Sequence, residues 1–283
     1  MQNHSKIIAK ELSIQTSQVE IVSAFLDDGA TIPFIARYRK EATGSLDEVK
    51  IAAIRDRRAD LFDLDKRRSV ILASLDERDL LNEALSQAIN TASDLAALED
   101  IYLPYRPKRR TRAYIAREKG LEPLATMLYD QNTQHIEPEA YVDAEKGVAT
   151  VEEALSGARD IMAEWISEDA SIRARLRDFF HRKSTITSTV IKNQEEKGVK
   201  FRDYFAWQEP VGKAAGHRLL AVFRGEQEKI LSLSFRPPEV ESLAILHRCL
   251  VRSRGFAGLQ VSMAAEDSYK RLLGPSLENE LRG

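Results

Sequence analysis

The stretch SLDEVKIAAIRDRRADLFDLDKRRSVILASLDERDLLNEALSQAINTASDLAALEDIYL, residues 45–103, decides the fold. It runs for fifty-nine residues without a glycine or a proline, the two strongest breakers of regular structure, so helices are predicted throughout. Ser45 and Glu48 form the pattern of a capping box at its start. An apolar stripe at spacings of three, four and seven follows in Leu46, Val49, Ile54, Leu61, Leu64, Ile71 and Leu75. The pattern predicts one helix of about thirty residues, or about 45 Å.

Charged side chains fill the other faces of this predicted helix, from Arg55 to Arg68. We interpret them as a solvated face laced with pairs at i and i+4. Shorter helices are predicted around it, over residues 18–28 behind a capping box at Ser17, and over residues 32–41, 80–89 and 94–102.

The segment from Pro104 to Lys119, here called the basic segment, concentrates positive charge. It holds seven cations in sixteen residues and one acid, Glu118, whereas the whole chain carries 42 basic and 44 acidic residues. Pro104 and Pro107 predict a stiff, extended linker. Seven neighbouring cations repel each other unless something anionic lies against them. That partner is either a phosphate backbone or the acidic side chains of another domain.

A second cationic cluster, TIPFIARYRK, covers residues 31–40. Three cations, Arg37, Arg39 and Lys40, flank Tyr38 at a predicted helix end. In the functional interpretation, the cations bind phosphate and the tyrosine ring stacks on a base. The structural alternative is that Phe34 and Tyr38 pack inside while the cations offset the helix dipole and pair with acids of the long helix.

The downstream half predicts helices over residues 122–129, 150–167, 171–182 and 239–253, and a strand at STITSTVI, residues 184–191. Two helices followed by a short hairpin of this strand and FRDYFAW outline a winged helix-turn-helix. The cations on its second helix suit a phosphate-facing surface or, in the alternative, offset the dipole at the helix end. These cations are Arg173, Arg175, Arg177, Arg182 and Lys183. Residues 217–223 and 229–235 alternate around Arg224 to Gln227, which predicts a β-hairpin.

Composition and motifs favour a cytoplasmic, non-catalytic protein. No apolar run approaches eighteen residues, and Cys249 has no partner for an internal disulfide and is interpreted as a core thiol. The sequence contains no phosphate-binding or dinucleotide-binding glycine motif, and its five histidines never pair at metal spacing. We therefore expect no catalytic residue, no metal and no cofactor.

Four stretches resemble a known family: DDGATIPFIARYRKEATGSLDEVKI, LEDIYLPYRPKRRTRAYIAREKGLEPLA, KFRDYF and HRLLAVFRGE. From about Val19 to Arg224 the chain resembles the N-terminal part of bacterial Tex proteins, the transcription accessory protein family. Members of that family continue into an RNase H-like domain, helix-hairpin-helix elements and an RNA-binding OB-fold. The resemblance implies that this chain is an N-terminal fragment that ends mid-protein.

The resemblance also implies a mainly α fold, an elongated multi-helix scaffold with a helix-turn-helix-like module and a small β-hairpin. The expected domains are residues 1–120, 121–205 and 206–283. A monomer is expected to serve transcription through RNA or DNA without sequence specificity, and through RNA polymerase or other transcription proteins. In the alternative, the chain is a purely structural or protein-interaction scaffold, and RNA binding is confined to the OB-fold. The predicted nucleic-acid contacts are Arg37, Arg39, Lys40, Arg106, Lys108, Arg109, Arg110, Arg112, Arg117 and Lys119.

Overall fold

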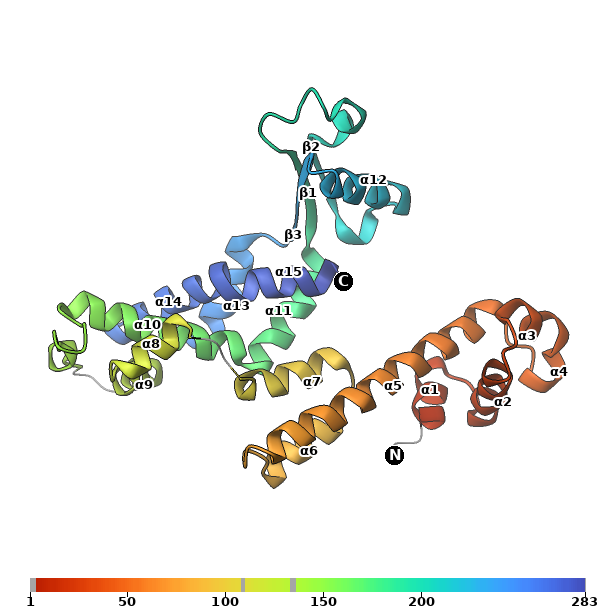
Figure 1. Cartoon of the computed structure of the whole chain (residues 1–283), viewed down its shortest axis with the longest axis horizontal. Coiled ribbons are helices and arrows are strands. Elements are labelled where there is room, and N and C mark those ends of the chain that lie inside the picture. The colour runs from red at the N-terminus through yellow and green to blue at the C-terminus, as the bar shows by residue number, and fades with distance from the viewer. Residues whose placement is uncertain (1–3, 108–109, 133–135, 283) are drawn as a thin grey trace. The chain divides into compact units, whose positions relative to one another are not determined.

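The computed structural model describes residues 4–107, 110–132 and 136–282, and it divides into two compact units. Unit 1 ends at Tyr105 and unit 2 begins at Arg106, whereas the first boundary expected from the sequence lies at Gly120. The described residues form fifteen α-helices and one three-stranded sheet (Figure 1). The predicted mainly α fold is therefore confirmed.

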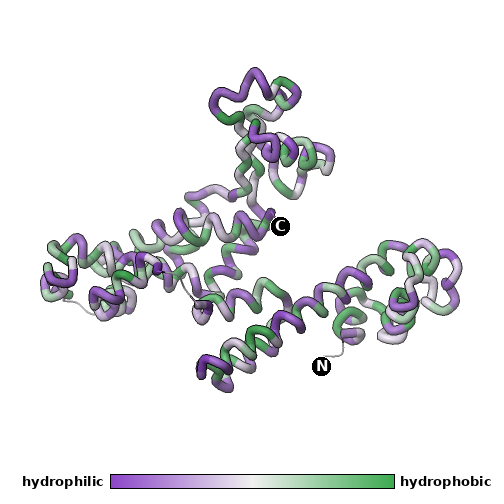
Figure 2. Tube along the Cα trace, in the orientation of Figure 1, coloured by the Kyte–Doolittle hydropathy of each residue, from purple (hydrophilic) through white to green (hydrophobic). Residues whose placement is uncertain are grey.

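Unit 1 is built around one long helix, α5. Its helices are α1 (His4–Leu12), α2 (Thr16–Asp27), α3 (Ile32–Tyr38), α4 (Lys40–Thr43), α5 (Glu48–Asp76), α6 (Glu83–Thr91) and α7 (Leu95–Tyr102). The buried residues of α5 include Ile54, Leu61, Leu64, Ile71 and Leu75, as the apolar stripe predicts. Hydrophilic and hydrophobic residues are interspersed along the helix (Figure 2).

The start of α5 differs from the sequence prediction. Asp47 is the N-cap, and its carboxylate accepts a hydrogen bond from the Lys50 amide at 2.8 Å. Ser45 lies outside the helix with a left-handed φ of 62°, directly after Gly44 at 65°. The chain therefore turns sharply there, and Val49, predicted to belong to the stripe, is 76% exposed.

The charged residues of α5 pair across the unit, where i,i+4 pairs were expected. Arg57 binds Glu11 of α1 through two hydrogen bonds of 2.8 and 2.9 Å, and Arg58 binds Asp27 at 2.7 Å. Arg67 pairs in the same way with Glu99 of α7. These pairs join α1, α2 and α7 to the long helix.

Arg68 is the most deeply buried of these cations, contrary to its assignment to a solvated face. Its guanidinium donates to the backbone carbonyls of Ile89 at 3.1 Å and Ala92 at 3.0 Å, and it pairs with Asp65. One carbonyl in the last turn of α6 and the carbonyl of its C-cap residue are thereby satisfied without solvent. The Arg68 side chain therefore stabilises the turn between α6 and α7.

The other helix ends of unit 1 show smaller differences. Gln15, two residues before the predicted Ser17, caps α2 by a reciprocal capping box with Gln18. The helix predicted over residues 32–41 divides at Arg39, which ends α3 and precedes α4.

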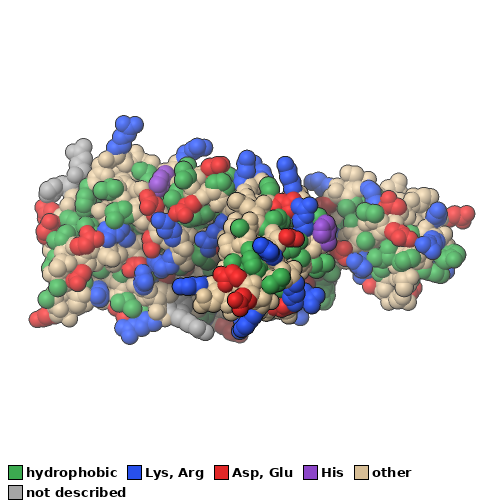
Figure 3. Space-filling model, turned by 90° about the horizontal axis from the view of Figure 1, so that it is seen from above, with side chains coloured by type: hydrophobic (Ala, Val, Ile, Leu, Met, Phe, Trp, Pro, Cys, Tyr) green, Lys and Arg blue, Asp and Glu red, His purple; other side chains and the backbone are tan. Residues whose placement is uncertain are grey.

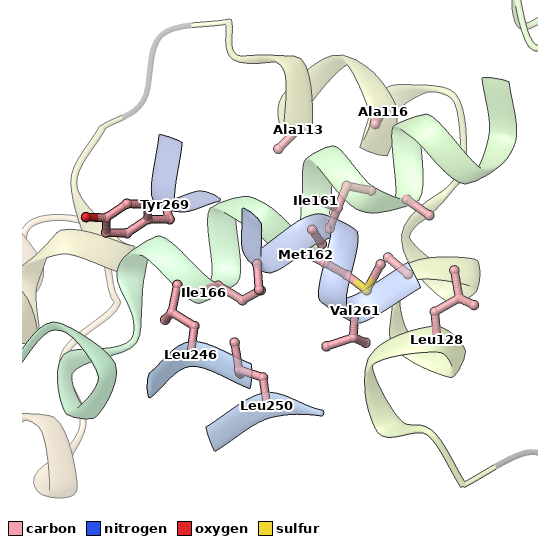
Figure 4. Packing of buried hydrophobic residues seen from close by; sticks show 14 of the residues in the cluster. Ala113, Ala116, Leu128, Ile161, Met162, Ile166, Leu246, Leu250, Val261 and Tyr269 are labelled. Carbon is pink, nitrogen blue, oxygen red and sulfur yellow. The ribbon is translucent and has the colours of Figure 1, made fainter. Parts of the chain in front are cut away.

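Unit 2 surrounds α10, whose buried residues lie in the largest core. Its helices are α8 (Arg112–Glu118), α9 (Glu122–Asp130), α10 (Val151–Glu168), α11 (Ala170–Lys183), α12 (Gly216–Gln227), α13 (Glu239–Leu250), α14 (Phe256–Ser268) and α15 (Gly274–Arg282). Thr150 and Glu153 form the predicted capping box of α10. Ile161, Met162 and Ile166 of α10 meet side chains of α9, α13 and α14 (Figure 4). Cys249 packs partly buried against this core, in agreement with its interpretation as a structural thiol.

The sheet forms a small lobe of unit 2 together with α12 (Figure 1). Its strands are β1 (Thr185–Val190), β2 (Ala206–Pro210) and β3 (Leu231–Arg236), in the antiparallel order β2-β1-β3. Ile186 of β1 pairs with Glu209 of β2 and Phe235 of β3. The predicted strand at residues 184–191 is therefore the central strand of the sheet.

The hairpin predicted between residues 217 and 235 is wrong, because its first half is the helix α12. Val222 and Gly225 face the core of the lobe at helical spacing, while Leu220, two residues before Val222, is exposed. A Cβ at position 225 would lie 2.5 Å from Leu231 Cδ1, so the glycine allows α12 to pack closely on β3. Lys229, with a left-handed φ of 57°, makes the turn instead.

The cations of α11 divide between two faces of that helix. Arg173 is buried and donates to the Ser276 hydroxyl at 3.2 Å, and Arg177 pairs with Glu280 of α15. Neither of these two side chains faces solvent for a phosphate, contrary to the sequence prediction. Arg175, Arg182 and Lys183 are exposed.

Glu278 of α15 binds the outer edge of β3. Its carboxylate accepts from the Phe235 amide at 2.7 Å and from Arg236 Nε at 2.6 Å. Burial favours the neutral acid, but these hydrogen bonds outweigh it and lower the pKa of Glu278 below its ordinary value of 4.5. Glu278 thereby satisfies a sheet edge that would otherwise carry an unpaired amide.

We expect Glu278→Gln to lower the free energy of unfolding by about 1 to 3 kcal/mol at pH 7, because a neutral amide leaves a buried donor poorly paired. The folded pKa is depressed, so the stabilisation from the charge is present above the unfolded pKa and lost as pH falls through the folded pKa. Urea unfolding of both proteins between pH 7 and pH 3 measures this. A difference between the two that stays constant over this range would contradict the assignment.

Candidate nucleic-acid interface

The basic segment is partly helical, whereas an extended linker was predicted. Leu103–Tyr105 forms one 3-10 turn, and α8 begins at Arg112 after Thr111. The Thr111 hydroxyl accepts from the Tyr114 amide at 3.0 Å as an N-cap. Two predicted contacts of the segment, Lys108 and Arg109, lie outside the described residues.

Arg117 fixes α8 to the body of unit 2. Its guanidinium donates to Glu164 of α10 at 2.7 Å and to Glu122 at 3.1 Å, while the Thr111 hydroxyl donates to the other Glu164 oxygen at 3.0 Å. The Glu164 side chain is only 9% exposed. Burial lowers the pKa of Arg117, but the hydrogen bonds to both carboxylates outweigh it and raise the pKa overall. Arg117 is therefore a structural cation that binds two carboxylates of unit 2.

Two further cations of the segment have partners within unit 2. The Lys119 ammonium donates to the Gly147 carbonyl at 2.7 Å. Arg110 Nη2 reaches Glu118 at 3.2 Å, but the Arg110 side chain is 71% exposed. A pair of this kind contributes little and opens readily to a competing anion.

Arg112 lies at a shallow pocket of about 270 Å³ between α8 and α10. The pocket is also lined by Lys119, Ser156 and Asp160. Burial raises the pKa of Asp160, although Arg271 at 3.1 Å and Arg112 favour its charged form. Arg112 is exposed, so its guanidinium remains accessible from solvent. Arg106, at the start of unit 2, is exposed as well.

The second cationic cluster belongs to unit 1. Arg37 Nε lies 3.8 Å from Glu48 Oε1 at the start of α5, as the structural alternative predicts for this cation. The Arg39 guanidinium lies over the rings of Phe25 and Phe34, and Lys40 is exposed at the start of α4. The structural alternative fails for Tyr38, whose side chain is 71% exposed.

Sequence reasoning missed the residues that hold these cations. Glu164 follows Arg117 by 47 residues and Phe25 precedes Arg39 by 14, so no local spacing connects them. Basic and acidic side chains are interspersed over the face shown in Figure 3. Accessibility of individual cations therefore separates the candidates for binding better than local charge density does.

Within the described part of the chain, no group of three or more His, Cys, Asp or Glu residues has the arrangement of a metal site. The same residues include no helix that is long and apolar enough to cross a membrane.

The structure is that of a mainly helical protein with a small sheet lobe and a cation-bearing helix, α8, held by Arg117. The chain belongs to the Tex family. The family model described as Tex-like protein N-terminal domain matches residues 2–76, and the model described as Tex central region-like matches residues 130–271. The basic segment lies between the two matches.

Curated relatives cover most of this chain. Protein YhgF of Escherichia coli K12 is 42% identical over 94% of the chain and 35% of its own length. Transcriptional accessory protein Tex of Neisseria gonorrhoeae is 42% identical over 83% of the chain and 31% of its own length. S1 RNA-binding domain-containing protein 1 of Homo sapiens is 27% identical over 93% of the chain and 28% of its own length. The chain thus spans about a third of the length of these relatives.

We expect Arg117→Ala to lower the free energy of unfolding by about 2 kcal/mol, because it leaves the Glu164 carboxylate buried without its cation. Arg110→Ala is the matched control on the same segment, with an expected cost below about 0.5 kcal/mol. Urea unfolding followed by tryptophan fluorescence, from Trp165 on α10 and Trp207 on β2, measures both.

The double variant Arg117→Met with Glu164→Leu removes both charges and should be more stable than Arg117→Ala. Equal costs for Arg117→Ala and Arg110→Ala would show that the pair with Glu164 does not anchor α8.

Proposed function

We propose that this chain is a non-catalytic scaffold of a transcription accessory factor, and that the exposed cations of its basic segment contact nucleic-acid phosphates. The exposed contacts are Arg106, Arg110 and Arg112. The proposal also includes Lys108 and Arg109, which lie outside the described residues. Arg117 and Lys119 hold the segment in place. The accessibility of Arg110 and Arg112 beside the anchored Arg117 is the observation that carries the proposal.

Anchoring favours binding because α8 is held before any ligand arrives. The Arg117 and Thr111 contacts to Glu164 fix the backbone at the start and the end of α8. Binding through α8 then costs the ordering of side chains and not of the helix. Non-specific phosphate contact requires no more than accessible cations in a defined place.

The balance of charge between the units supports placing the contact in unit 2. Unit 1 carries 13 basic and 18 acidic residues, and unit 2 carries the other 29 basic and 26 acidic residues. A polyanion is therefore repelled by the net charge of unit 1 and attracted by that of unit 2.

The names of the relatives agree with this role, since one is a transcriptional accessory protein and another an S1 RNA-binding domain protein. We propose a cytoplasmic monomer that acts with the transcription machinery, and RNA or DNA bound without sequence specificity.

A second candidate function is a protein-interaction scaffold with RNA binding confined to other parts of the longer protein. The pair between Arg117 and Glu164 favours it, because this cation docks on an acidic helix as that alternative predicts. The two functions differ in whether Arg106, Arg110 and Arg112 act on nucleic acid or on a protein.

We expect replacement of Arg106, Arg110 and Arg112 by Ala to weaken binding of a labelled single-stranded RNA. The slope of log K against log salt concentration should become shallower by about 0.7 for each cation that contacts a phosphate, or about 2 for all three. Fluorescence anisotropy at four salt concentrations measures affinity and slope together.

The matched control replaces Lys192, Lys197 and Lys213 by Ala, which removes the same charge from exposed positions elsewhere in unit 2. Its slope should stay close to that of the parent chain. An unchanged slope in the first variant, or equal changes in both, would refute the assignment to the basic segment. A protein scaffold predicts unchanged RNA binding in both.

A further inference from the structure

The guanidinium of Arg39 lies over two aromatic rings on the surface of unit 1. Its guanidinium carbon lies 5.6 Å from the centroid of Phe25 and 5.4 Å from that of Phe34. Phe25 packs against the core of unit 1, so one of the two rings is itself fixed. Within the described part of the chain, no carboxylate pairs with Arg39. Its N–H groups therefore remain available to an anion while cation–π contacts restrict the side chain.

The backbone around Arg39 is also fixed. Its amide donates to the Ile35 carbonyl at 3.0 Å, and its carbonyl accepts from the Thr43 hydroxyl at 3.1 Å. Thr43 is fully buried, and its own carbonyl accepts from Gln18 Nε2 at 2.8 Å. The corner between α3 and α4 is thereby fastened to α2. The backbone and the side chain of Arg39 are therefore both held in place, unlike a long side chain that moves freely in solvent.

Tyr38 extends this cluster with an open aromatic face. Its ring centroid lies 5.4 Å from that of Phe34, and its side chain is 71% exposed although the ring is largely apolar. Lys40 is exposed two residues further on, and Arg37 precedes the tyrosine. An accessible ring beside a positioned arginine matches the two parts of a nucleotide, a flat base and a phosphate.

We propose that Tyr38 and Arg39 form a binding site for single-stranded nucleic acid, in which a base stacks on Tyr38 and the adjacent phosphate binds Arg39 and Lys40. This rests on the proposed function of the chain in nucleic-acid contact and adds a second site of different physical character. Stacking tolerates any base, so the site has no sequence preference.

The charge of unit 1 makes the site selective for single strands. Its 13 basic against 18 acidic residues repel a dense phosphate array, and a duplex has no open base face to offer in return. A single strand has fewer phosphates near the surface and gains the stacking contact. An acidic protein segment would use Arg39 and Lys40 but gain little from the exposed ring, which favours nucleic acid as the occupant.

The test compares Tyr38→Ala with Tyr38→Phe on a labelled ten-nucleotide RNA, single-stranded and as a duplex. Tyr38→Ala should lower single-strand affinity about tenfold, and Tyr38→Phe, which keeps the ring, should leave it unchanged. Duplex affinity should not respond to either. The salt slope should also stay constant in Tyr38→Ala, because stacking releases no counterions.

Arg39→Ala should weaken single-strand binding and make the salt slope shallower by about 0.7. Phe62→Ala is the control, since Phe62 is a 66% exposed ring elsewhere on unit 1. It should have no effect on either RNA. Urea unfolding of each variant shows whether the corner between α3 and α4 is intact.

The outcomes separate this inference from the proposed function. If Tyr38→Ala retains full single-strand affinity while the basic-segment variant loses it, the site at Tyr38 is refuted and the proposed function stands. If both variants retain full affinity, both proposals fail. Equal losses of single-strand and duplex affinity in Tyr38→Ala would also refute the stacking site.

Discussion

The ion pair between Arg117 and Glu164 determines the arrangement of α8, the helical part of the basic segment. A carboxylate as buried as Glu164 needs a cation and hydrogen-bond donors, and α8 supplies both from Arg117 and Thr111. Once these contacts form, α8 lies along α10 and Ala113 and Ala116 enter the core shown in Figure 4. The cations that do not enter this arrangement are left at the surface. The ion pair that occupies Arg117 therefore leaves Arg110 and Arg112 exposed on the surface.

The same constraint organises unit 1. Arg68 is buried and is satisfied by two backbone carbonyls and Asp65, and Arg57, Arg58 and Arg67 each reach a carboxylate on another helix. Arginine suits this task because its planar fork donates in several directions and it remains charged when buried. In both units, the number of cations in a stretch is a poor guide to how many can meet a ligand. Arg39, held by rings in place of a carboxylate, is a different case.

Sequence patterns predicted the local structure better than they predicted which residues pair with the charged side chains. The capping box at Thr150 and the apolar stripe of α5 are short-range patterns, and both are present. Residues 217–223 were misread because Leu219, Leu220, Val222 and Phe223 fit a strand as well as a helix, and the decision rests on packing against β3. The candidate site was predicted in composition, since Arg110 and Arg112 are accessible. Its anchor was not, because Glu164 is distant in sequence and resembles any other helical glutamate.

The two proposed sites rely on different physical terms, and their difference has a consequence for selectivity. Phosphate contact at the basic segment weakens steeply as salt rises, while a stacked base is nearly indifferent to salt. The excess of acidic residues on unit 1 opposes every polyanion, so only a ligand that gains from the exposed Tyr38 ring overcomes it there. This repulsion acts more strongly on duplexes than on single strands, because a duplex presents a denser array of phosphates. Specificity is a difference of affinities, so a penalty on binding the duplex counts as much as a gain in binding the single strand. If both proposed sites bind nucleic acid, the net negative charge of unit 1 is a source of discrimination between single strands and duplexes.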